Sequence, residues 1–150
     1  YQFELTIAGP YGSEWEAFLS KTTIPGNVKI ISLGPILNNE VYKLMSESDI
    51  FCVPAQRESL GIANIEAMAI GVPVVSTKEG GILETTNNGK NAWLSERKNP
   101  EDLAIQLKLC IEGMEARKIK AENAKIFVKE NFNVERMMSQ MEVFFKEEFQ

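Results

Sequence analysis

Short runs of alternating or continuous apolar residues recur along the first two thirds of the chain, and segments with helical spacing separate them. Residues 3–8 alternate apolar and polar side chains and stop at a Gly-Pro pair, which is typical of a strand. Residues 50–53 form a continuous apolar run of the kind that is buried on both faces of a sheet. Strands are predicted at residues 3–8, 28–33, 50–53, 72–76 and 92–94. With helices between them, this order predicts an α/β fold with a parallel sheet.

Helix-start signals mark several of the predicted helices. Ser13 and Glu16 form a capping box, Asn38 can cap a second helix, and Asn99 followed by Pro100 opens another. The last third of the chain is helical throughout. Helices are predicted at residues 13–24, 38–49, 60–70, 99–112, 115–130 and from 133 onward, and the turn-rich residues 77–89 are expected to form a loop.

The last predicted helix has an apolar face built from methionine and phenylalanine. We interpret this face as core packing rather than as a cofactor-binding surface, because methionine commonly fills gaps in hydrophobic cores. The residues on this face are Met137, Met138, Met141, Phe144, Phe145 and Phe149.

The most informative segment is the helix predicted at residues 60–70, which is apolar nearly all round and therefore indicates a buried element. Glu66 is its only charge, and a carboxylate in such surroundings is costly unless hydrogen bonds satisfy it. Ser59 is a candidate N-cap, and Gly61 would let a ligand approach N–H groups that have no partner within the helix. With Glu58 just before the helix, the segment predicts an anion site flanked by two carboxylates.

Composition narrows the classes of function. The chain has 150 residues, 44% hydrophobic and 25% charged, as in an ordinary single globular domain. The net charge of −5 leaves no basic stripe for nucleic acid, and without histidine the usual zinc sites and imidazole catalysis are excluded within this chain. Cys52 and Cys110 follow apolar patterns and are interpreted as small core residues. No apolar run approaches a membrane span and no signal peptide is present, so we expect a cytoplasmic location.

A longer ordered motif runs through the same segment. Glu58, seven intervening residues and Glu66 are followed by Ala67-Met68-Ala69, Gly71, Pro73-Val74-Val75 and then Gly80-Gly81-Ile82-Leu83-Glu84. This string resembles the nucleotide-sugar-binding, C-terminal half of a family 4 (group 1) glycosyltransferase of GT-B fold. The resemblance extends along essentially the whole chain, and it implies a Rossmann-like parallel sheet flanked by helices.

The resemblance implies roles for the two glutamates. Glu58 resembles the catalytic glutamate near the donor sugar and the reacting carbon, with a surface carboxylate that favours a helix N-terminus as the alternative. Glu66 resembles the glutamate that accepts hydrogen bonds from ribose hydroxyls, with a structural carboxylate as the alternative. The backbone N–H groups of Gly61, Ile62 and Ala63 are the implied donors to the distal phosphate, unless these small residues only permit tight packing.

Three further substrate-binding loops are implied, and they contain Gly9, Pro35 with Ile36, and Gly80, Gly81 with Glu84. The first would face the donor, the second resembles the loop whose backbone reads the nucleobase, and the third lies beside the donor sugar in the family. The first two could equally be ordinary turns between strands and helices. Glu84 could be a helix-start charge or a partner for a nearby lysine.

The sequence departs from the family pattern at several points. Ser59-Leu60 replaces the commoner glycine-aromatic pair, and Ala92 stands where a glycine often follows Asn91. The Arg and Lys that clamp the donor diphosphate in the family, and the N-terminal domain that holds the acceptor, have no counterpart in these residues. We therefore expect a piece of a longer two-domain enzyme whose sheet lacks its first strand, the central one in the order 3-2-1-4-5-6. This piece alone is expected to bind donor weakly and to transfer no sugar.

The first interpretation of function is the donor-binding domain of a retaining glycosyltransferase of the hexosyltransferase class, acting in polysaccharide or glycoconjugate assembly. It implies a UDP-, GDP- or ADP-sugar as donor, no cofactor and no metal. It leaves open a peripheral membrane association of the full-length enzyme at the inner face of the membrane. In the family the terminal helix crosses back toward the other domain, so part of its apolar face is expected to be exposed here or paired in a homo-oligomer.

Two alternatives belong to other classes. One is a non-catalytic nucleotide-binding or interaction domain of the same fold. The other is a dinucleotide-binding module, which is disfavoured because Gly9-Pro10-Tyr11-Gly12 does not complete the G-x-G-x-x-G fingerprint. No acidic residue closes the following strand to bind a ribose, which disfavours this module further.

Overall fold

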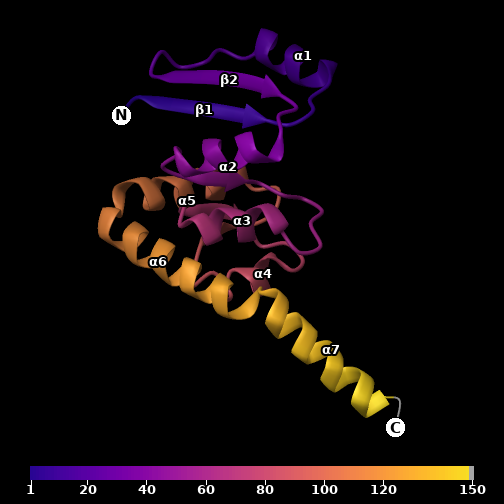
Figure 1. The fold of residues 1–150 in the computed structure, drawn as a ribbon. Coiled ribbons are helices and arrows are strands. Elements are labelled where there is room, and N and C mark those ends of the chain that lie inside the picture. The colour runs from indigo at the N-terminus through magenta and orange to yellow at the C-terminus, as the bar shows by residue number, and fades with distance from the viewer. Residues whose placement is uncertain (149–150) are drawn as a thin grey trace. The chain divides into compact units, whose positions relative to one another are not determined.

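The computed structural model describes residues 1–148 and divides the chain into two compact units, Tyr1–Lys43 (unit 1) and Leu44–Gln150 (unit 2). Each unit is described by itself (Figure 1). Both contain parallel strands connected through helices, which confirms the α/β fold expected from the sequence. Among the described residues, no helix combines the length and the hydropathy that crossing a membrane requires.

Unit 1 is built on a two-stranded parallel sheet. The strands β1 (Phe3–Ala8) and β2 (Val28–Gly34) pair directly, and α1 (Ser13–Lys21) connects them. The Trp15 indole of α1 donates a hydrogen bond of 2.9 Å to the Ser32 hydroxyl of β2. This bond between side chains fixes the helix against the sheet.

Unit 2 contains a three-stranded parallel sheet in the order β3 (Phe51–Val53), β4 (Val74–Thr77) and β5 (Trp93–Ser95). β4 lies in the centre, and all four of its residues are buried, as a strand covered on both faces requires. The C-terminal end of β4 carries the buried hydroxyls of Ser76 and Thr77.

Helices cover this sheet in the described part of unit 2. α5 packs on β4 and β5, while α3 packs on α6 and on the short helix α4. The helices are α3 (Ile62–Ile70), α4 (Ile82–Thr85), α5 (Pro100–Glu112), α6 (Met114–Asn131) and α7 (Val134–Glu148). α2 (Asn38–Ser46) spans the division between the units.

The core of unit 2 lies between α5 and the sheet. Val75, Trp93 and Cys110 form a buried cluster, against which Cys52 packs. Burial raises the pKa of both cysteine thiols to about 11, so the two residues behave as the core residues that the sequence predicts.

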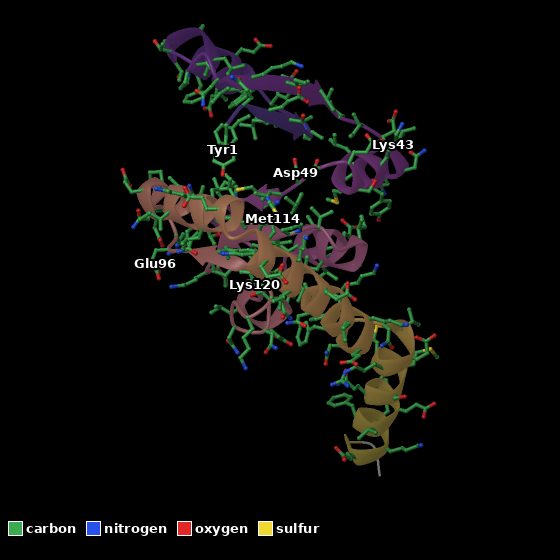
Figure 2. The ribbon with its side chains drawn as sticks, turned by 90° about the vertical axis from the view of Figure 1, so that its left-hand side faces the viewer. Tyr1, Lys43, Asp49, Glu96, Met114 and Lys120 are labelled. Carbon is green, nitrogen blue, oxygen red and sulfur yellow. The ribbon has the colours of Figure 1, made fainter. Side chains whose placement is uncertain are left out.

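The side chain of Lys120, on α6, connects this helix to the segment before β5 through hydrogen bonds (Figure 2). Its ammonium donates hydrogen bonds of 2.9 Å to the carbonyls of Gly89 and Ala92, and it lies 4.9 Å from the centre of the Trp93 ring. Burial lowers the pKa of Lys120. The aromatic contact and the two carbonyls supply the favourable interactions that a partly buried cation needs.

Several helix starts differ from the predictions. Asn99 caps α5 as expected, since its side chain accepts a hydrogen bond of 2.9 Å from the Asp102 N–H. Ser13 and Asn38, however, are the first residues of their helices rather than N-caps. The proposed Ser59 cap is also wrong, because α3 begins at Ile62 with Gly61 as its N-cap. A fourth difference is α4, a short helix that forms within the predicted loop at residues 77–89.

The apolar face of α7 is exposed, so its interpretation as core packing is wrong for this chain. Figure 1 shows α7 extending beyond the helices and strands of unit 2. Phe149 lies outside the described residues. The exposed fractions of the others are 53% for Met137, 58% for Met138, 49% for Met141, 56% for Phe144 and 52% for Phe145.

Candidate functional site

The start of α3 is held by the carboxylate of Glu58. Glu58 Oε1 accepts hydrogen bonds from the backbone N–H groups of Gly61 (3.0 Å) and Leu60 (3.2 Å). These bonds lower the pKa of Glu58 below its ordinary value, and the bond from Gly61 has the largest effect. Gly61 has φ +79°, and a Cβ there would lie 3.1 Å from the Asn64 side chain, so only glycine fits this cap without strain. Glu58 therefore binds the backbone just before the first helical residue, Ile62, and does not cap the N–H groups inside α3.

The glycine loop Gly80-Gly81 packs directly against the backbone beside Glu58. A Cβ on Gly80 would lie 2.0 Å from the Glu58 carbonyl oxygen, and one on Gly81 would lie 2.4 Å from the Ser59 carbonyl oxygen. The Gly81 N–H donates a hydrogen bond of 2.8 Å to that Ser59 carbonyl. The structure thus joins three predicted site residues, Glu58, Gly80 and Gly81, through backbone contacts that require glycine.

Polar side chains that the sequence analysis did not single out bind the backbone that leads from β3 toward Glu58. The Ser76 hydroxyl donates to the Val53 carbonyl (2.9 Å) and accepts from the buried Asn64 amide (3.2 Å), and the Thr77 hydroxyl donates to the Ala55 carbonyl (2.6 Å). The only sequence signal for these roles is a pair of hydroxyl residues at the end of an otherwise apolar strand. That signal alone does not identify their acceptors.

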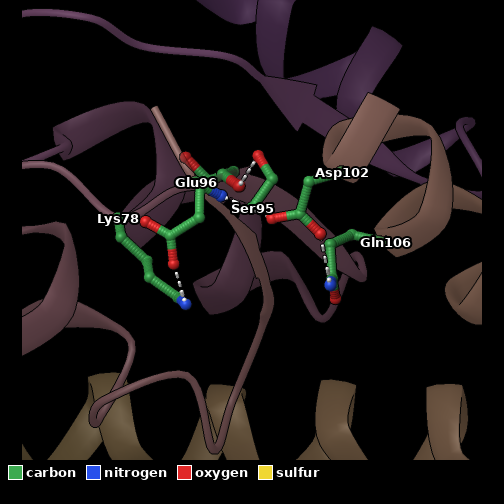
Figure 3. Close-up of polar contacts among 6 residues, drawn as sticks. Lys78, Ser95, Glu96, Asp102 and Gln106 are labelled. Atoms are coloured by element: carbon green, nitrogen blue, oxygen red, sulfur yellow. Dashed lines mark hydrogen bonds and ion pairs between the residues drawn. The ribbon is translucent and has the colours of Figure 1, made fainter. Parts of the chain in front are cut away.

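Ion pairs connect the start of the glycine loop to the segment after β5. Lys78 pairs with Glu96, which raises the pKa of Lys78 (Figure 3). Glu79 accepts from Arg97 through both carboxylate oxygens, at 3.0 and 3.2 Å. Asp102 accepts from the Glu96 N–H at 2.7 Å, and this bond lowers the pKa of Asp102. The glycine loop is therefore attached on both sides, to the Glu58 segment and to the segment that leads into α5.

The other predicted residues of α3 lie at and after its start. Ile62 is 62% exposed, so the helix is less buried than its composition predicts. Because the first N–H groups of a helix have no acceptor within it, those of Ile62 and Ala63 are suited to bind an anion. The Gly61 N–H, in contrast, is engaged by Glu58. Glu66 lies half-buried one turn further along α3, and Glu84 is exposed on α4.

The remaining predicted residues belong to unit 1, where they follow the carboxyl ends of the strands. The Gly9 N–H donates a hydrogen bond of 2.8 Å to the Gly34 carbonyl, which brings the loop after β1 beside the loop after β2. Both glycines have positive φ angles, of 130° and 68°. Pro35 is exposed and Ile36 half-buried next to this contact. The two predicted loops are thus neighbours within unit 1, at the sheet edge where open α/β folds bind ligands.

Comparison with known proteins identifies the chain's relatives. The family model described as "Glycosyl transferases group 1" matches residues 1–127. N-acetyl-alpha-D-glucosaminyl L-malate synthase of Bacillus anthracis is 31% identical over 117 residues, which cover 78% of this chain and 30% of the relative. An amylovoran biosynthesis glycosyltransferase of Erwinia amylovora is 33% identical over 121 residues, 74% of this chain and 29% of the relative.

The solved structures agree with the sequence relatives. The Anabaena protein HepE, crystallised in complex with UDP-glucose, superposes with a TM-score of 0.80 and 25% identity over 95% of this chain and 40% of HepE. The chain spans about a third of the length of the curated relatives it matches. The two strand–helix units, the glutamate-bearing start of α3 and these matches lead to one assignment: the chain belongs to the group 1 glycosyltransferase family and has the fold of its C-terminal GT-B domain.

Proposed function

We propose that the full-length protein is a retaining glycosyltransferase of the hexosyltransferase class and that this chain binds its nucleoside-diphosphate sugar. The observation that carries the proposal is the fixed position of Glu58 at the N-terminus of α3, in a chain of the group 1 family. HepE, which has the same fold, was crystallised with UDP-glucose, and this supports a nucleotide sugar as the ligand.

The reaction must stabilise the negative charge that develops on the leaving diphosphate. A preorganised helix N-terminus does this without reorganisation, and we assign the contact with the distal phosphate to the N–H groups of Ile62 and Ala63. Because Glu58 Oε1 is engaged by the backbone, Oε2 is the oxygen that we assign to the hydroxyls of the donor sugar. Glu66, with two acceptor oxygens, suits the two adjacent hydroxyls of a ribose.

Two loops of unit 1, taken by itself, are also assigned roles in donor binding. We assign the backbone at Pro35 and Ile36 to the nucleobase and the loop at Gly9 to the donor. Gly80, Gly81 and Glu84 are assigned to the side of the donor sugar. The acceptor is assigned to a separate N-terminal domain of the full-length enzyme. A role in polysaccharide or glycoconjugate assembly is supported by the named amylovoran biosynthesis relative. We propose a cytoplasmic reaction that needs no metal.

Calorimetry on the full-length protein with UDP, GDP, ADP and their glucose conjugates tests the proposal. We expect one nucleotide series to bind and Glu66→Gln to weaken that binding at least about tenfold, since bonds to a charged acceptor are lost. Glu142→Gln on α7 is the matched control, because it makes the same charge change at a side chain that is 71% exposed. If no nucleotide binds, or if Glu66→Gln and Glu142→Gln behave alike, the proposal is wrong.

Product analysis separates the enzyme from a non-catalytic nucleotide-binding domain. With a bound donor, we expect turnover that persists in EDTA, a product with the donor's anomeric configuration by NMR, and loss of turnover in Glu58→Gln. Nucleotide binding without any turnover across a panel of sugar acceptors would favour the non-catalytic alternative. Inverted configuration would contradict the retaining mechanism alone.

A further inference from the structure

We infer that Thr77 is a positioning residue for the proposed transfer: its hydroxyl holds the irregular segment at residues 54–61 so that Glu58 meets the donor sugar. The inference rests on the proposed function, because it requires Glu58 to contact the donor. Thr77 is the last residue of β4 and is 4% exposed, and its hydroxyl donates a bond of 2.6 Å to the Ala55 carbonyl.

Four hydrogen bonds join this segment and the end of β3 to the stretch from β4 to α4, and in all four the donor lies on the β4–α4 stretch. Donors on the stretch from β4 to α4 bind carbonyls of the stretch that begins at the end of β3 and contains Glu58. Residues 54–61 belong to no helix or strand, so they lack the regular backbone hydrogen bonds by which a helix or a sheet fixes its path. The bonds are Ser76 Oγ to the Val53 carbonyl, Thr77 Oγ1 to the Ala55 carbonyl, the Gly81 N–H to the Ser59 carbonyl and Thr85 Oγ1 to the Leu60 carbonyl.

Among the side-chain donors, the loss of Thr77 should disturb the segment most, because the bonds of Ser76 and Thr85 each have an alternative. The Val53 carbonyl also accepts from the Ala55 N–H at 3.0 Å, so it keeps a partner if the Ser76 hydroxyl is lost. The Thr85 hydroxyl lies 3.3 Å from the Leu60 carbonyl and equally 3.3 Å from a carbonyl of its own helix. The Ala55 carbonyl accepts from the Thr77 hydroxyl at 2.6 Å, and the Thr77 hydroxyl is not shared with a carbonyl of its own strand.

The bond acts close to the carboxylate that it would position. Ala55 lies three residues before Glu58, between the end of β3 and the contact of Glu58 with the glycine loop. Loss of the Thr77 hydroxyl removes this donor from the Ala55 carbonyl near the beginning of the segment, and we expect the segment to relax toward water to replace the lost bond. The Glu58 carboxylate then leaves its position at the start of α3. We expect loss of the contact with the sugar and retention of the contacts with the nucleotide.

The test uses the full-length protein with UDP and UDP-glucose, or with the GDP or ADP pair if calorimetry selects it. Thr77→Val should reduce the preference for UDP-glucose over UDP about tenfold and lower kcat by at least as much, with the Kd of UDP within about twofold. Thr77→Ser, which keeps the hydroxyl, should restore both values. The matched control is Thr86→Val. Thr86 follows the last residue of α4 and is 0% exposed, and its hydroxyl donates at 2.6 Å to the Ile82 carbonyl of that helix.

A double-mutant cycle distinguishes positioning from a general structural role. In a Glu58→Gln background, Thr77→Val should cause no further loss of preference or of kcat, because both changes remove the same contact. Additive losses, or equal weakening of UDP and UDP-glucose, would overturn the inference. If Thr77→Val and the similarly sized Thr77→Cys both fail to fold, the hydroxyl is needed for folding itself and the positioning role is rejected.

The same cycle separates this inference from the function on which it rests. If Glu58→Gln alone changes neither turnover nor the preference for the nucleotide sugar, the proposed function fails. If Glu58→Gln has its expected effect while Thr77→Val behaves like Thr86→Val, only the positioning role of Thr77 fails.

Discussion

Helices α3 and α7 both carry methionine on an apolar face, but their surroundings differ. Met68 of α3 is fully buried, and the start of α3 is tied to β4 and to the glycine loop. Met138 and Met141 of α7 are 58% and 49% exposed. Apolar side chains at helical spacing therefore predict a helix in both places, whereas burial depends on which elements lie opposite. Composition alone does not distinguish a helix that supports a site from one with an open face.

Equivalent truncations in the two helices should give the largest contrast. Met68→Ala creates a cavity in a closed core and should lower the free energy of unfolding by about 2–5 kcal/mol. Met141→Ala removes a half-exposed side chain and should change it by less than about 0.5 kcal/mol. The chain has two tryptophans, Trp15 in unit 1 and Trp93 in unit 2. In a Trp15→Phe background, tryptophan fluorescence during urea unfolding therefore comes from Trp93 and reports on unit 2 alone. Similar losses from the two variants would show that the apolar face of α7 is covered in solution.

The glycine loop beside α3 should be the next most sensitive feature. Gly80→Ala places a Cβ against the Glu58 carbonyl and also strains a residue with φ +48°, so we expect a loss of about 1–3 kcal/mol. Gly26→Ala is the control, since a Cβ there has open space and its φ is unexceptional. The Trp93 transition in the Trp15→Phe background measures Gly80→Ala, whereas the Gly26→Ala control in unit 1 is measured in chains that keep Trp15. An unchanged Gly80→Ala would mean that the loop is not packed on the Glu58 backbone.

Removing a helix cap should have a smaller effect on the free energy of unfolding, about 1 kcal/mol, and only where the helix packs on the core. Asn99 caps α5, and Asn133 accepts a hydrogen bond of 2.7 Å from the Arg136 N–H at the start of α7. Asn99→Ala should lower the stability of unit 2 by about 1 kcal/mol, because α5 packs on the sheet. Asn133→Ala should reduce the helicity of α7 in circular dichroism without moving the Trp93 transition. A shift of that transition by both variants would show that α7 unfolds together with the core.

The fold was predictable from the sequence where the signal was local. Alternation at residues 3–8 and the cap with proline at Asn99-Pro100 each depend on neighbouring residues, and both predictions are confirmed. Helix starts were harder to predict where two side chains compete. Ser59 was the expected cap of α3, but the helix begins later, at Ile62, and the Glu58 carboxylate binds the Leu60 and Gly61 N–H groups that precede it.

The candidate site was predictable only in part, because its members depend on contacts far apart in sequence. The motif identified Glu58, Gly80 and Gly81, which the structure brings together. It gave no indication that Thr77 donates to the Ala55 carbonyl, since that bond depends on strand register and on the bend after β3. Pairing of Glu79 with Arg97 was likewise not foreseen, because eighteen residues separate them.

The smallest expected effect concerns pH, and it follows from the chemistry of the two helix starts. At the start of α7 the acceptor is the neutral side-chain amide of Asn133, whereas at the start of α3 the acceptor is the ionisable carboxylate of Glu58. Its hydrogen bonds lower the pKa of Glu58, so the ionised form stabilises the fold above the unfolded pKa. That contribution is lost as the pH falls through the lower, folded pKa.

This pH dependence is measurable by NMR on the amide groups that Glu58 binds. The amide shifts of Leu60 and Gly61 should titrate together, with a midpoint below the usual glutamate value of about 4.3. The transition should disappear in Glu58→Gln, because the amide cannot titrate and keeps only a neutral acceptor oxygen. In urea the Glu58 carboxyl should return to the usual midpoint, since the backbone bonds are gone. A midpoint at the usual value in the folded chain would mean that the carboxylate does not hold the start of α3, and the electrostatic difference between α3 and α7 would then disappear.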